Sequence, residues 1–173
     1  MKFKLTTREI VIMGVLIAMK IILSRYLSIN LGNTIRINFG FVGTAIMATF
    51  FGPMWTAIGC GAGEVLGFFL FSTGAFHPGF TFSAMVSGFI YGILLYNKHF
   101  SWWRIILIQV LSLVIITFGL NTIWLSLLYG DSYIAVLSTR IAVNLITLPI
   151  NIVLLGLTSK FLLPQLRFAI RPA

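Results

Sequence analysis

The chain has 173 residues, of which 59% are hydrophobic and only 9% are charged, and its mean hydropathy is +1.05. This composition excludes a water-soluble globular domain and is typical of an integral membrane protein. The formal net charge is +9, but the basic residues mostly lie outside the apolar runs and do not alternate with stacking aromatic residues. The charge therefore indicates membrane topology and excludes a nucleic-acid-binding surface.

Turn signals divide the apolar sequence into six stretches, each close to the roughly 20 residues that a membrane-spanning helix needs. The Gly52-Pro53 pair separates the second from the third, because proline ends one helix and is accepted at the start of the next. We predict an all-α integral membrane protein in which residues 1–173 form one bundle of six transmembrane helices. The expected helices span residues 10–27, 37–52, 53–72, 80–97, 102–128 and 133–163.

Lysine and arginine residues predict the orientation of the bundle. Six helices place both termini on the same side of the membrane, and most of the basic residues fall on that side, so we expect both termini to be cytoplasmic. Four basic residues fall instead within the membrane or toward the outside: Lys20, Arg25, Arg36 and Arg140. Ionisable residues in such positions are candidates for a functional site.

Glu64 is the only acidic residue inside the long apolar stretches, and it follows a run rich in glycine. An ionised carboxylate at the centre of a bilayer is costly, by about 3 kcal/mol or more, unless it is paired. Two interpretations are open: Glu64 accepts hydrogen bonds from a substrate, or it forms a structural ion pair with Lys20 or Arg140. Most polar groups gather in the outward half of the predicted bundle, which favours a pocket open to the outside.

The same residues exclude several classes of site. His77 and His99 fall on opposite sides of the predicted membrane, so no nucleophile, base and orienting group assemble with Glu64, and we predict no catalytic activity. Neither histidine lies inside a helix, which argues against a haem-carrying anchor. The single cysteine, Cys60, offers no multi-cysteine metal site. We therefore predict neither a cofactor nor a bound metal.

Gly14 and Ala18 lie one turn apart in the first predicted helix, a spacing that allows two helices to approach closely in lipid. Packing within the chain and docking of a partner both remain open for this pair. A six-helix basic protein with such a pair resembles the substrate-binding S components of energy-coupling factor (ECF) vitamin transporters. Four further segments are similar to those of the folate-specific members: Arg36–Phe41, Phe51–Trp55, Phe76–Thr81 and Gly119–Leu125.

The resemblance implies a subunit that captures folate at the outer face of a prokaryotic cell membrane. It also implies association with a membrane scaffold subunit and two ATPases, with Gly14 and Ala18 docking on the scaffold. The sequence has no GxxxxGK[ST] pattern, so the partners would supply ATP hydrolysis. Alternatives are the same architecture with another vitamin, such as riboflavin or pantothenate, and a membrane subunit with no transport role.

Folate would require several different side chains. A buried carboxylate suits the N–H donors of the pterin ring, which assigns Glu64 to that edge. Guanidinium groups suit the two carboxylates of the glutamate tail, with Arg36 preferred to Arg25 because it lies in a family-like segment. Arg140 either binds substrate or neutralises Glu64. The remaining candidates are two amides for ring hydrogen bonds, two aromatic surfaces and one loop histidine: Asn121, Asn144, Trp124, Phe39 and His77.

Overall fold

The computed structural model of the protein describes residues 6–26, 29–31, 35–71, 77–98, 101–130 and 132–162. In these residues the chain is helical apart from one short antiparallel hairpin, and the helix from residue 102 to residue 129 changes to π-type hydrogen bonding over its central part. The elements are α1 (Thr7–Arg25), β1 (Ile29–Leu31), β2 (Ile35–Ile37), α2 (Gly40–Phe71), α3 (Pro78–Leu95), α4 (Trp102–Leu111), η1 (Ser112–Asn121), α5 (Thr122–Tyr129), α6 (Tyr133–Leu157) and η2 (Thr158–Leu162).

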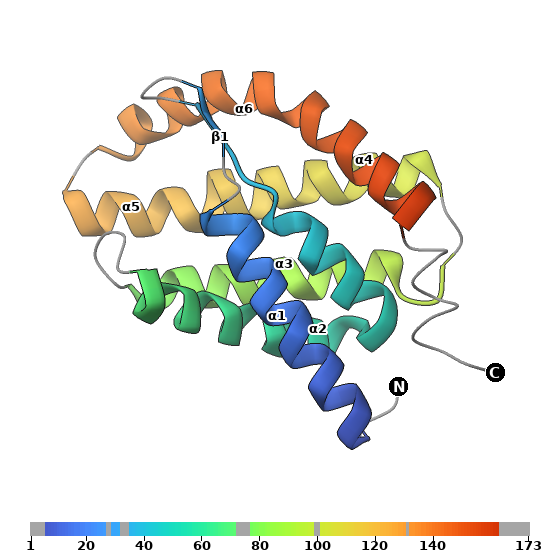
Figure 1. Ribbon diagram of the computed structural model, residues 1–173. Coiled ribbons are helices and arrows are strands. Elements are labelled where there is room, and N and C mark those ends of the chain that lie inside the picture. The colour runs from blue at the N-terminus through green and yellow to red at the C-terminus, as the bar shows by residue number, and fades with distance from the viewer. Residues whose placement is uncertain are drawn as a thin grey trace.

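Helix α2 turns back on itself at Gly52, as Figure 1 shows. The backbone of Gly52 has φ 77° and ψ −177°, a left-handed conformation that glycine adopts without steric cost, and Pro53 follows without an N–H to continue the helix. Thr44 lies eight residues before Gly52 and Cys60 lies eight residues after it. The Sγ of Cys60 donates to the Oγ1 of Thr44 at 3.6 Å. The two halves of α2 therefore pack against each other, and the break predicted at Gly52-Pro53 is present without an intervening loop.

Four helical stretches in the described residues are long and apolar enough to cross a membrane: Gly40–Phe71, Pro78–Leu95, Trp102–Tyr129 and Val136–Phe161. They confirm the predicted class, a helical membrane protein. Helix α1 does not belong to this set because its 19 residues carry four charged side chains. The described chain thus forms five continuous helical runs, whereas the sequence predicted six separate helices. The strands β1 and β2 lie between the first two expected helices, and β2 includes Ile37, the first residue of the expected second helix.

Helix α1 lies across α2 (Figure 1), and three glycine residues of α2 face it. A Cβ atom on Gly43 would come within 2.9 Å of the Cβ of Lys20, which leaves no space for a larger residue. In the other half of α2, a Cβ on Gly63 would lie 3.9 Å from the Nζ of Lys20, and one on Gly67 would lie 3.7 Å from the Nε of Arg25. Gly43 thus allows α1 to approach the first half of α2 closely, while Gly63 and Gly67 lie beside the cationic side chains of α1.

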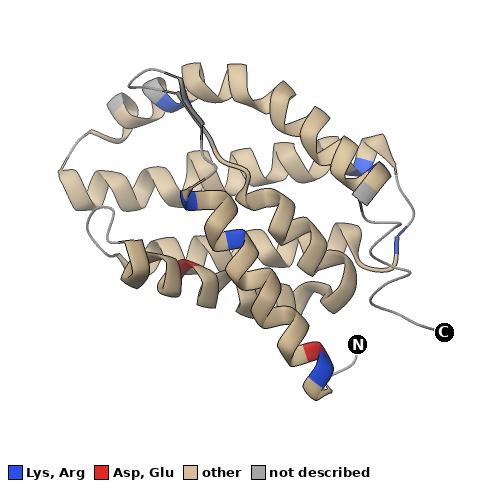
Figure 2. Cartoon of the chain, viewed as in Figure 1, with Lys and Arg blue, Asp and Glu red and all other residues tan. Residues whose placement is uncertain are grey.

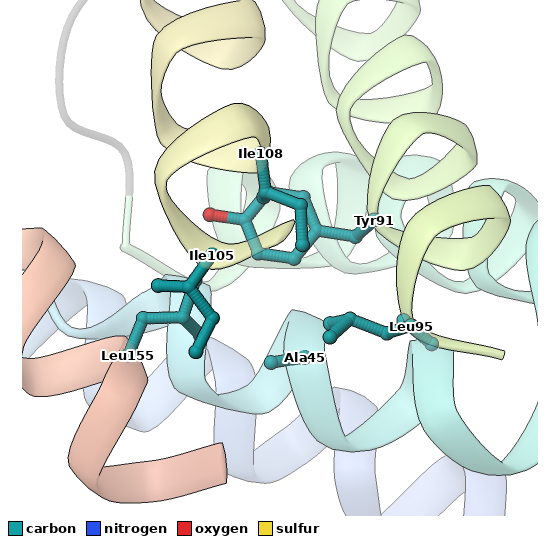
Figure 3. Close-up of a cluster of buried hydrophobic side chains, with 7 residues drawn as sticks. Ala45, Tyr91, Leu95, Ile105, Ile108 and Leu155 are labelled. Atoms are coloured by element: carbon teal, nitrogen blue, oxygen red, sulfur yellow. The ribbon is translucent and has the colours of Figure 1, made fainter. Parts of the chain in front are cut away.

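The hydrophobic core joins α2 to α3, α4 and α6. Figure 3 shows its buried side chains, which meet between these helices. They include Ala45, Tyr91, Leu95, Ile105, Ile108 and Leu155. Helix α3 also approaches the second half of α2 directly, because a Cβ on Gly88 would lie only 2.6 Å from the backbone oxygen of Thr56.

The bundle has two distinct ends. At one end, the ring of Tyr96 lies 3.3 Å from the Cβ position of Gly52, and Trp102 contacts Gly156, so the α2 bend lies beside the end of α3 and the start of α4. The opposite end, which we call the hairpin end, holds β1, β2, the end of α1 and the start of α6 (Figure 1). Successive connections between helices therefore lie at opposite ends of the bundle.

The close approach of Gly88 to the backbone of Thr56 predicts that a larger residue at position 88 lowers stability. Gly88→Val should lower the melting temperature of the detergent-purified protein, because the added atoms meet backbone that cannot move aside; the expected loss is about 2 kcal/mol or more. Differential scanning fluorimetry measures the shift. Gly14→Val is the matched control, since nothing lies within 4 Å of its Cβ position. Equal effects of the two substitutions would contradict the packing described for α3.

Candidate functional site

A cavity of about 540 Å³ lies between α1, α2, η1 and α6. Its lining is almost entirely polar, with Val143 as its one apolar residue. The lining residues are Ser24, Arg25, Asn38, Glu64, Thr117, Arg140, Val143, Asn144, Thr147 and Asn151. Such a concentration of polar groups is unusual in a chain that is 59% hydrophobic, and Figure 2 shows how few charged residues the helices carry elsewhere. Polar groups at membrane depth characteristically line a substrate or ion path.

The carboxylate of Glu64 is paired with Arg25, the last residue of α1. Arg25 Nη2 donates to Glu64 Oε1 at 3.3 Å, and the two side chains are 18% and 37% exposed. The sequence predicted Lys20 or Arg140 as the structural partner, and that choice was wrong. Lys20 reaches another group, since its Nζ donates to the backbone oxygen of Cys60 at 3.3 Å. The Nε of Arg25 also lies beside Gly67, in the same half of α2 as Glu64.

Helix α6 contributes one polar stripe to the cavity wall. Arg140, Asn144, Thr147 and Asn151 recur every three or four residues, so they share one helical face. Asn144 Nδ2 donates to the backbone oxygen of Arg140 at 2.8 Å, and Thr147 Oγ1 donates to that of Val143 at 3.2 Å. The guanidinium of Arg140 has no ion-pair partner in the described part of the chain. It is a cation available to a ligand.

The structure brings four of the predicted site residues together: Glu64, Arg25, Arg140 and Asn144. It adds lining residues that the sequence analysis did not select, namely Ser24, Asn38, Thr117, Val143, Thr147 and Asn151. Two of these, Thr147 and Asn151, continue the spacing begun by Arg140 and Asn144. A search for polar residues at helical spacing in the last apolar stretch would have found them.

Two other predicted residues, His77 and Trp124, contact each other outside the described cavity lining. His77 Nδ1 accepts the N–H of Gly79 at 3.1 Å and caps α3, while its ring lies against Trp124 with centroids 5.3 Å apart. Trp124 Nε1 donates to Ser83 Oγ at 3.1 Å. Together these contacts fasten the start of α3 to α5. A role for His77 or Trp124 in binding stays a prediction.

Three more predicted residues do not belong to the described lining. Asn121 has a buried Oδ1 that finds no hydrogen-bond partner among the described residues. Phe39 is half-buried immediately before α2. Arg36 pairs with Asn30 across the β hairpin, and its side chain lies outside the described part of the structure. Their contact with a substrate stays a prediction.

Gly14 and Ala18 lie on an exposed face of α1. Nothing in the described structure lies within 4 Å of the Cβ position of Gly14, and Ala18 is exposed as well. The neighbouring Val11 and Val15 are 62% and 63% exposed. The described part of the chain therefore leaves this small-residue face open, which rules out close intramolecular packing by described residues as the reason for the pair.

The chemistry of the cavity is that of binding. No group of three or more His, Cys, Asp or Glu residues able to hold a metal ion occurs within the described ranges. The cavity instead offers two guanidinium groups, one carboxylate, three amides and three hydroxyl groups. This set can hold an anionic ligand that has hydrogen-bonding groups along its length.

Comparisons with known proteins identify relatives over most of the chain. A family model described as "ECF transporter, substrate-specific component" matches residues 8–157. The protein "Folate transporter FolT" of Leuconostoc mesenteroides is 38% identical over 157 residues, which are 86% of this chain and 83% of the relative. "Folate transporter FolT" of Clostridium novyi is 37% identical over 143 residues, 83% of each chain. A crystal structure of FolT bound with folic acid superposes with a TM-score of 0.81 at 34% identity, covering 89% of this chain and 92% of the other.

The ion pair in the cavity makes a prediction about the ligand-free protein. Arg25→Gln and Glu64→Gln should each lower the free energy of unfolding, because each leaves a charge near apolar helices without its partner; the double substitution should cost less than the sum. We expect a coupling of about 1 kcal/mol for this partly exposed pair. Thermal unfolding of the four proteins in detergent measures it. Strictly additive losses would show that the pair does not stabilise the fold.

Proposed function

The chain belongs to the substrate-specific components of ECF transporters, and we propose that it is a folate-binding member that captures its ligand in the polar cavity. The sequence supports this function through two relatives named as folate transporters. The observation in the structure that carries it is the guanidinium of Arg140, which lines the same cavity as the Arg25–Glu64 pair and has no counterion among the described residues.

The size and charge of the cavity suit folate. A volume of about 540 Å³ lies within the range of about 300–1,000 Å³ that small-molecule sites occupy. Among the described lining residues, two guanidinium groups and one carboxylate leave an excess of one positive charge, which attracts an anion, and the glutamate tail of folate carries two carboxylates. Riboflavin has no carboxylate, and pantothenate has one but lacks a ring, so neither matches the site as fully.

We assign the guanidinium groups of Arg140 and Arg25 to the tail carboxylates, which they can bind bidentately. Arg36 lies in β2 at the hairpin end and remains a further candidate for the tail. Glu64 has two possible roles: it receives N–H donors of the pterin, as the sequence suggested, or it holds Arg25 in position. Asn144 can offer its side-chain oxygen to the ligand, because its nitrogen is already bonded within α6.

The partners follow from the family. We propose that the hairpin end faces outward, that the two halves of α2 count as two of six membrane-spanning segments, and that both termini are cytoplasmic. A membrane scaffold and two ATPases would complete the transporter in the prokaryotic cell membrane and supply ATP hydrolysis. The exposed face at Gly14 and Ala18 is suited to the scaffold, because small residues allow close contact between helices in lipid.

Substitution of Arg140 tests the binding site. Arg140→Gln should weaken folate binding by about 10-fold to 100-fold, since it removes a charge-assisted bidentate contact. It should leave binding of 6-hydroxymethylpterin, which has no glutamate tail, within about threefold of wild type. Isothermal titration calorimetry of the detergent-purified protein measures both.

Arg140→Lys is the matched variant, because it keeps the charge and loses the bidentate geometry; an intermediate affinity is expected. Equal losses for folate and the tail-less pterin would remove the carboxylate assignment. Titration of the wild type with riboflavin and pantothenate belongs to the same series. Tight binding of either, without binding of folate, would replace the proposed substrate.

The docking face is tested separately. Gly14→Leu should leave folate affinity of the isolated protein unchanged, because the residue lies outside the cavity lining, and it should prevent co-purification with a co-expressed scaffold and ATPases. Gly14→Ala keeps a small residue and is expected to assemble normally. If Gly14→Leu assembles as well as wild type, the scaffold binds another surface.

A further inference from the structure

The side-chain amide of Asn151 lies half-buried in the cavity wall without a hydrogen-bond partner in the described part of the chain. Its Oδ1 is inaccessible to solvent and has no hydrogen-bond partner, and no bond to its Nδ2 occurs in the described part of the chain. A buried polar group without a partner costs about 1–3 kcal/mol, so such a group requires an explanation. Neither the oxygen nor the nitrogen of the amide has a hydrogen-bond partner in the described structure. The same holds if the amide is rotated by 180°.

The backbone of Asn151 is held by a side chain of α4. Gln109 of α4, only 7% exposed, donates from Nε2 to the backbone oxygen of Asn151 at 3.4 Å. This contact attaches α4 to α6 at the level of the uncommitted amide. The other polar side chains of the α6 stripe differ, because Asn144 and Thr147 each donate to the backbone of their own helix. Among them, Asn151 alone has both amide groups free within the described structure.

The two arginines of the cavity and the amide of Asn151 lie at different levels. Arg25 ends α1 at the hairpin end, and Arg140 lies in the first two turns of α6. Asn151 follows Arg140 by eleven residues, about 16 Å along a helix at about 1.5 Å per residue. Thr117, from the π-helical segment η1, also lines the cavity, and π-type segments inside helices are frequent at functional sites. A long ligand can therefore place its anionic end near Arg140 and a neutral end near Asn151.

We propose that Asn151 is the residue that recognises the pterin ring, and that Gln109 positions it. This inference rests on the proposed function. The 4-oxo pyrimidine edge of a pterin presents a ring N–H donor beside a carbonyl acceptor. A side-chain amide presents the complementary pair, a carbonyl oxygen beside an NH₂ group. Two parallel hydrogen bonds satisfy both halves of Asn151 and hold the ring at the Asn151 end of the cavity, with the glutamate carboxylates at Arg140 and Arg25.

The contact distinguishes folic acid from its N3-methyl analogue, in which a methyl group replaces the ring N–H, so that a side-chain amide turned either way cannot form both hydrogen bonds. A site built to bind a hydrogen-bonding group rejects an analogue that leaves its own polar atoms unpaired. The wild type should bind folic acid at least about tenfold more tightly than the analogue, because the methyl group removes one hydrogen bond and leaves part of the amide unpaired. Asn151→Leu should abolish that preference, mainly by weakening folic acid.

The experiment is a calorimetric titration of the detergent-purified full chain with both ligands. Asn151→Asp keeps an acceptor for the ring N–H but places a second acceptor against the 4-oxo group, so it should weaken folic acid and reduce the preference; this near-isosteric variant keeps the test decisive if Asn151→Leu does not fold. Gln109→Leu should reduce the preference partly, since it loosens the support without removing the amide. Val153→Ala is the control: the residue lies on the same helix, is 52% exposed and is absent from the cavity lining.

The outcomes separate this inference from the function on which it rests. A wild type that binds no folate contradicts both. A wild type that binds folate and an Asn151→Leu protein that retains the full preference overturn the role of Asn151 alone. That role is also overturned if Glu64→Gln abolishes the preference and Asn151→Leu does not, because Glu64 would then receive the pterin. Loss of the preference in Asn151→Leu, with Val153→Ala unchanged, supports the proposal.

Discussion

The ion pair between Arg25 and Glu64 is the constraint to which much of the architecture responds. An isolated carboxylate among apolar helices is unfavourable, and a neighbouring guanidinium at 3.3 Å provides charge and a hydrogen-bond donor together. The pair joins the end of α1 to the second half of α2. Gly67 lies beside the Nε of Arg25, and Gly63 lies beside the side chain of Lys20. Gly43 allows the backbone of α1 at Lys20 to approach α2 closely.

The reversal of α2 at Gly52 gives the cavity its shape. Because the two halves pack side by side, Asn38, which precedes the first half, and Glu64 in the second half reach the same cavity despite their separation in sequence. Helix α1 crosses both halves, and α6 closes the other side with its polar stripe. A left-handed glycine followed by proline therefore does more than connect two helices, since it brings together the walls of a binding site.

The sequence predicted the membrane class, the break at Gly52-Pro53 and the family from composition, proline chemistry and short motifs. It also selected Glu64, Arg25, Arg140 and Asn144, because ionisable and amide groups are conspicuous in apolar stretches. It did not predict the partner of Glu64. The partner of Glu64 depends on how α1 and α2 are rotated about their own axes. An estimate of depth along each helix does not give that rotation. The sequence did not single out Thr147 and Asn151, because hydroxyl and amide groups often form hydrogen bonds within their own helix. Only the packed structure shows which of these groups have no hydrogen-bond partner.

The polarity of the cavity limits what can bind there with high affinity. An empty cavity of this kind holds water, so a ligand gains only the difference between its own hydrogen bonds and those of the water it displaces. A ligand that left Arg140 or the Asn151 amide unpaired would lose the full cost of desolvating that group. Charge at one level of α6 and an uncommitted amide at another therefore demand a ligand that is anionic at one end and a neutral hydrogen-bonding ring at the other. Selectivity then arises from these two requirements together, since a molecule that meets only one of them leaves a buried polar group unsatisfied.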